Sequence, residues 1–138
     1  MSVVKARVIL FIIFFLGLVL QVVAIQVAFS KDHIYAAERF NLIFILVQVY
    51  SVHLAIVIGG IFNASLPRSR RAESTPIYLF VIAVLLVLAW NGFLVWPSIA
   101  FGFMSRGTDT DLAEQFTQVS TYSSWLLAGL LAFYFSKK

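Results

Sequence analysis

Four long apolar runs, separated by short clusters of charged residues, constrain this chain more than any other feature of its sequence. An α-helix rises about 1.5 Å per residue, so runs of this length cross a hydrocarbon core of roughly 30 Å. Lipid requires each backbone amide to find its partner within a helix or a closed barrel, and these runs lack the strict alternation of barrel strands. The sequence therefore predicts an all-α polytopic membrane protein, one domain with four transmembrane helices at about 8–29, 36–64, 76–104 and 111–135.

The amino-acid composition is also typical of a membrane protein, and it limits the kinds of partner that we expect the chain to bind. Hydrophobic residues make up 62% of the 138 residues and charged residues 12%, whereas soluble domains are roughly 45–50% apolar. The chain has no cysteine, which excludes disulfides and thiolate metal sites. A net charge of +4 is spread over several short segments and does not form a nucleic-acid face. We expect the lipid bilayer as a partner, and no nucleic acid.

The distribution of basic residues predicts the topology. In an up-down bundle with four spans, seven of the ten lysines and arginines fall on the side of the two termini. Cytoplasmic segments carry the excess of basic residues, so both termini are expected in the cytoplasm and the protein in a plasma membrane or a bacterial inner membrane. The residues expected to contact lipid headgroups there are Arg68, Arg70, Arg71, Lys137 and Lys138.

Small and polar residues recur at helical spacing in the first and third runs. Gly17, Gln21, Ala24 and Ala28 share one face of the first predicted helix, and Asn91, Ser98 and Gly102 follow one line on the third. Small residues let helix backbones approach closely, and an amide in hydrocarbon needs a hydrogen-bonding partner. We therefore expect the face of the first helix to pack against another helix.

The second predicted helix has two such faces. Taken at 100° per residue, one face carries Asn41, Gln48, Ser51, Ala55 and Gly59, and we expect it to pack within the chain. The opposite face carries three residues and is the candidate contact with a second subunit: His53, Gly60 and Ala64.

Four polar residues of the spans are expected at similar depth if the helices run up and down: Gln21, Gln48, Asn91 and Thr121, the last beside Ser120. They are candidates for a functional layer or for packing. As packing residues they would form interhelical hydrogen bonds of about 0.6 kcal/mol each. As functional residues they would line a hydrated path, which requires a cavity. The residue types favour packing.

His53 is an ionisable residue near the middle of a predicted span, where a charge is costly. Three roles compete for it: a neutral, hydrogen-bonded packing residue, a haem or metal ligand, and a titrating residue in a pore. Haem usually takes two axial ligands, and His33, the other histidine of the chain, is expected in a loop. We expect the packing role, and no cofactor or metal.

Chemistry-bearing motifs are absent from the sequence. It contains no Ser-His-Asp arrangement, no glycine-rich phosphate loop and no histidine-rich metal motif, so we do not expect an enzyme. Asp111 and Glu114 have the spacing of a helix-capping box, which gives these acidic residues a structural role.

The functional hypothesis is a non-catalytic integral membrane subunit that assembles by transmembrane helix packing, with copies of itself or with other membrane subunits. The alternative is a small homo-oligomeric ion channel or pore whose path is lined by the polar residues of the spans. A third possibility is a membrane protein that acts only by recognising another protein.

Overall fold

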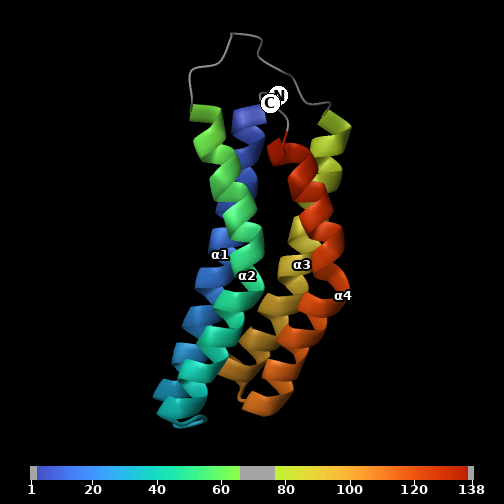
Figure 1. Cartoon of the computed structure of the whole chain (residues 1–138). Coiled ribbons are helices and arrows are strands. Elements are labelled where there is room, and N and C mark those ends of the chain that lie inside the picture. Colours follow the sequence, from blue (N-terminus) through green and yellow to red (C-terminus); the bar gives the residue numbers. More distant parts are fainter. Residues whose placement is uncertain (1–2, 66–76, 137–138) are drawn as a thin grey trace.

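The computed structural model describes residues 3–65 and 77–136, which form four helices (Figure 1). They are α1 (Val3–Ser30), α2 (Ala36–Ser65), α3 (Ile77–Met104) and α4 (Asp109–Ser136). These described residues contain no strand. The all-helical fold and the four expected helices are thereby confirmed.

Three of the helices are long and apolar enough to cross a membrane. The qualifying segments are Lys5–Ser30 in α1, Ala36–Ile56 in α2 and Phe80–Met104 in α3. As far as its residues are described, α4 is not among them. Large apolar side chains are exposed on the outside of the bundle, for example Leu85 and Phe93, which are 60% and 68% exposed. Such a surface suits contact with lipid rather than water.

Each helix packs against two neighbours. α1 lies against α2 and α3, α4 lies against the same two helices, and the contact between α1 and α3 is the most extensive. Figure 1 shows the connections 31–35 and 105–108 at one end of the bundle, and the first residues of α1 with the last of α4 at the other. Apolar side chains fill the centre, among them Phe14, Phe101, Phe116, Leu10, Ile25 and Leu94.

The contact between α1 and α3 is made by the small-residue faces that the sequence predicts. Gln21, Ala24 and Ala28 are fully buried. A methyl group added at Gly102 would overlap the backbone carbonyl of Ala24, and one added at Gly17 would overlap the side-chain oxygen of Asn91. The predicted faces of the first and third helices therefore meet each other, with almost no space between their backbones.

The orientation of α2 is opposite to the expected one. His53 is fully buried within the chain, whereas Gln48 and Ser51 are exposed. The physical reason is the size of the neighbouring side chains: Leu42, Leu46, Val49 and Tyr50 lie on the His53 side and are buried with it. Large side chains make more van der Waals contacts with the neighbouring helices than a stripe of small and polar ones would, and packing of this kind drives helix association in lipid. The stripe of Asn41, Gln48, Ser51 and Ala55 consequently faces outward.

Candidate functional site

The middle of the bundle contains a buried polar network formed by one side chain from each of α1, α2 and α3. Gln21 donates a hydrogen bond of 2.6 Å from Nε2 to the hydroxyl of Tyr50. The Tyr50 hydroxyl in turn donates one of 2.7 Å to Oδ1 of Asn91. At most 5% of each of these side chains is exposed. The network therefore joins three helices within the apolar core.

Backbone carbonyls of the same helices hold the two amides in place. Gln21 Nε2 also donates to the carbonyl of Gly17 over 3.1 Å, and Asn91 Nδ2 donates to the carbonyl of Val87 over 2.9 Å. Gly17 leaves room for the Asn91 side chain, because a side chain at that position would overlap it. Among the described residues, Gln21 Oε1 has no hydrogen-bond partner.

Tyr50 connects the network, although it is not among the site residues predicted from the sequence. A signal was present, because Tyr50 precedes His53 by three residues and therefore lies close to the same face of the helix. A tyrosine hydroxyl in a membrane span needs a partner in the same way as an amide does.

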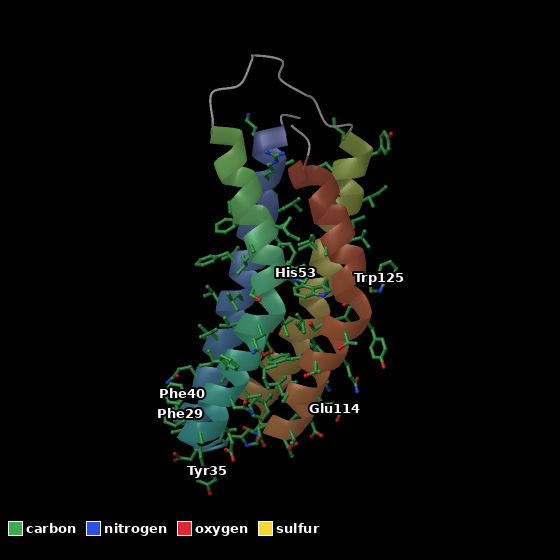
Figure 2. All side chains as sticks on the ribbon, in the orientation of Figure 1. Phe29, Tyr35, Phe40, His53, Glu114 and Trp125 are labelled. Carbon is green, nitrogen blue, oxygen red and sulfur yellow. The ribbon has the colours of Figure 1, made fainter. Side chains whose placement is uncertain are left out.

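Aromatic rings surround His53 beside this network. The ring of Phe14 stacks on the imidazole with centroids 5.7 Å apart and planes inclined by 14°, and the ring of Trp90 lies 4.8 Å away. Nδ1 of His53 is 3.2 Å from the carbonyl oxygen of Val49, which can accept a hydrogen bond when Nδ1 carries the proton. Figure 2 shows His53 between the helices. Its position is that of a packed core residue.

The four polar residues expected in one layer are divided between the interior and the surface. Gln21 and Asn91 are joined through Tyr50, whereas Gln48 and Thr121 are exposed. The Thr121 hydroxyl donates to the carbonyl of Thr117 over 2.8 Å, within its own helix. Further along α4, Trp125 is 71% exposed and projects outward (Figure 2). The expected single layer is therefore not formed within the chain.

A second group of polar residues lies in the connection from α3 to α4. The capping box is formed by Thr108 and Asp111, not by Asp111 and Glu114, because α4 begins at Asp109. Thr108 N donates to Oδ2 of Asp111 over 2.9 Å, and Asp111 N donates to the Thr108 hydroxyl over 3.2 Å. Hydrogen bonds from the Thr108 hydroxyl, and then from its backbone N–H, hold the pKa of Asp111 below its ordinary value.

For the remaining residues predicted from the sequence, the structure describes no side-chain contacts. Arg68, Arg70, Arg71, Lys137 and Lys138 lie outside the described residues, and Gly60 and Ala64 belong to α2 but their surroundings are not described. Within the described part of the chain, no group of three or more acidic or histidine residues could hold a metal ion. Comparisons of the sequence and structure with protein-family models, curated proteins and solved structures find no match.

Proposed function

We propose that this protein is a non-catalytic integral membrane subunit that assembles laterally, with copies of itself or with other membrane proteins, through the outward face of α2. In this proposal all four helices cross a plasma membrane or bacterial inner membrane as an up-down bundle, with both termini in the cytoplasm. The observation that carries the proposal is the exposed stripe of Asn41, Gln48, Ser51 and Ala55. Gln48, Ser51 and Ala55 lie in the second half of Ala36–Ile56, the part of α2 that is apolar enough to cross a membrane.

An amide facing lipid is unfavourable, because hydrocarbon offers it no hydrogen bond and the loss amounts to several kcal/mol. Among the described residues, none forms a hydrogen bond with the side-chain amide of Gln48. A neighbouring helix would supply that hydrogen bond, and the small side chains of Ser51 and Ala55 would let the two backbones approach. The interior network is already joined across three helices and is therefore assigned to the stability of the bundle rather than to assembly.

Cysteine crosslinking tests the proposal in a chain that has no native cysteine. Ser51→Cys places one thiol in the outward stripe, and Phe93→Cys places one on the exposed apolar surface of α3 as a matched control. Oxidation in membranes should give a disulfide-linked dimer from Ser51→Cys and none from Phe93→Cys. Assembly with another membrane protein should give a detergent-solubilised complex that Gln48→Leu dissociates. A monomer in detergent, unaffected by Gln48→Leu and not crosslinked at position 51, would refute the proposal.

A homo-oligomeric pore is the second candidate, favoured by the outward position of Gln48 on α2 and of Thr121 on α4. Around a symmetry axis these side chains would line a path between subunits, whereas the interior of one chain is filled with aromatic rings. Purified protein in planar bilayers should then conduct ions, and Gln48→Leu should change the conductance. Asn91→Leu is the control for an interior polar residue. Absence of conductance in the native protein removes this candidate and leaves the proposed assembly untouched.

A further inference from the structure

An open cavity of about 290 Å³ lies where α3 ends and α4 begins. Its apolar wall comes from the last turns of α3 and includes Trp96, Pro97 and Ala100, and its polar wall comes from the connection and the first turns of α4. The volume is close to the lower end of the range for small-molecule sites. The cavity therefore has room for a group the size of a lipid headgroup.

Two opposite charges line this cavity without pairing to each other. Arg106 and Asp111 both contribute to the lining. Among the described residues, the Arg106 guanidinium has no ion pair, and the Asp111 carboxylate bonds to Thr108 in the capping box. A capping carboxylate keeps a free lone-pair position, since two oxygens offer about four acceptor sites. The lining of the cavity thus contains one cationic and one anionic residue.

The position of the cavity relates it to lipid. Trp96, Pro97 and Ala100 lie within the membrane-length segment Phe80–Met104, and Arg106 is the second residue after that segment. Trp96 is 63% exposed, and tryptophan is enriched at the level of lipid headgroups. The apolar wall is therefore placed to contact acyl chains, while the charged wall is at the depth of headgroups.

We propose that this cavity binds a zwitterionic phospholipid, with the phosphate on Arg106, the ammonium group on Asp111 and the start of the acyl chains against Trp96 and Ala100. Arginine forms paired hydrogen bonds with phosphate oxygens, and a carboxylate accepts hydrogen bonds from an ammonium group. An anionic phospholipid would gain the Arg106 contact but would bring no cation to Asp111. The charges of the cavity therefore favour a headgroup that carries both signs. The inference rests on the membrane placement in the proposed function but not on lateral assembly.

The test measures lipid retention by the full chain in mild detergent by native mass spectrometry, with phosphatidylethanolamine, phosphatidylglycerol or soluble phosphoethanolamine added. Arg106→Gln removes the cation, and Ala100→Phe fills the cavity without changing a charge. Lys31→Gln is the matched control, since it removes a positive charge at the same end of the bundle but outside the cavity lining. Arg106→Gln and Ala100→Phe should each weaken phosphatidylethanolamine binding about tenfold, the effect of losing about 1.4 kcal/mol, and Lys31→Gln should leave it unchanged.

Three results would overturn the inference. Phosphatidylglycerol bound as tightly as phosphatidylethanolamine would mean that the site selects only for phosphate. Equal losses in Lys31→Gln and Arg106→Gln would mean that general surface charge, not the cavity, attracts lipid. Phosphoethanolamine bound as tightly as the lipid would make the site one for a soluble ligand. Resistance of the protein to extraction from membranes by alkaline carbonate checks the membrane placement separately, so a failure there is distinguishable from a failure of lipid selection.

Discussion

The hydroxyl of Tyr50 lies 2.7 Å from Oδ1 of Asn91 and links α2 to α3 inside the apolar core. Tyr50→Phe removes this donor and also the acceptor of Gln21 Nε2. A hydrogen bond within a membrane bundle contributes about 0.6 kcal/mol on average, but here a buried amide oxygen is left without a donor. We therefore expect the free energy of unfolding to fall by about 1 to 2 kcal/mol.

Unfolding in mixed micelles with increasing sodium dodecyl sulfate, followed by circular dichroism, measures this change. Tyr35→Phe is the matched control, because Tyr35 is 80% exposed and loses the same hydroxyl. Equal unfolding midpoints for Tyr50→Phe and Tyr35→Phe would mean that the network does not stabilise the bundle.

Alanine substitutions at Gly102 and Gly92 on α3 test the close approach of α1 and α3. A methyl group at Gly102 meets the backbone of Ala24, which cannot move without shifting α1, whereas one at Gly92 has no described atom within 4 Å. Overpacking of this kind costs about 1 to 3 kcal/mol, so Gly102→Ala should lower the unfolding midpoint by that equivalent. Gly92→Ala should leave the midpoint unchanged or raise it, because alanine gains up to about 1 kcal/mol over glycine in a helix. A Gly102→Ala protein as stable as Gly92→Ala would contradict the close approach of α1 and α3.

The sequence contained enough information to predict the helices and the faces of α1 and α3 that carry small residues, but not that these two faces meet each other. Spacings of three, four and seven place Gly17, Gln21 and Ala24 on one face and Asn91 and Gly102 on another. Most other residues of both helices are apolar, so the small residues mark the surface where two backbones approach. For helices apolar enough to cross a membrane, the usual contrast between a polar and an apolar face is weak, and small residues are the stronger signal of a helix contact.

The orientation of α2 could not be predicted from the same pattern. Both of its faces carry small or polar residues, so composition alone does not decide which one turns inward. The large side chains on the His53 side favour turning that face inward, and they pack there because other helices supply partners: Phe14 and Trp90 surround His53, and Gln21 and Asn91 bond to Tyr50. Contacts between residues so far apart in the chain cannot be inferred from spacing within one helix. The same limit applies to the cavity, whose walls come from two helices and their connection.

The hydrogen bonds between Thr108 and Asp111 predict how the stability of the protein depends on pH. Its hydrogen bonds lower the pKa of Asp111 in the folded protein, so the carboxylate adds stability above the ordinary aspartate pKa of about 4, and this stability is lost as the pH falls through the folded pKa. Thr108→Ala should raise the pKa of Asp111 toward its ordinary value and reduce the loss of stability in acid. Carboxyl titration by NMR measures the shift. Thr117→Ala is the control, since its hydroxyl bonds to the carbonyl of Ala113, and a shift of the same size there would contradict the capping assignment.

Two substitutions at His53 distinguish a packing role of its ring from a chemical role of its ring nitrogens. Its ring is covered by Phe14 and Trp90, so His53→Phe preserves an aromatic ring of similar size while it removes both nitrogens. If the role is packing, His53→Phe should change the free energy of unfolding by less than about 1 kcal/mol, as volume-conserving core changes do. His53→Ala should lower it by about 2 to 4 kcal/mol, because a cavity remains among the rings. Crosslinking through Ser51→Cys should persist in the His53→Phe background. Loss of that crosslink, or equal destabilisation by phenylalanine and alanine, would instead assign the role of His53 to its ring nitrogens.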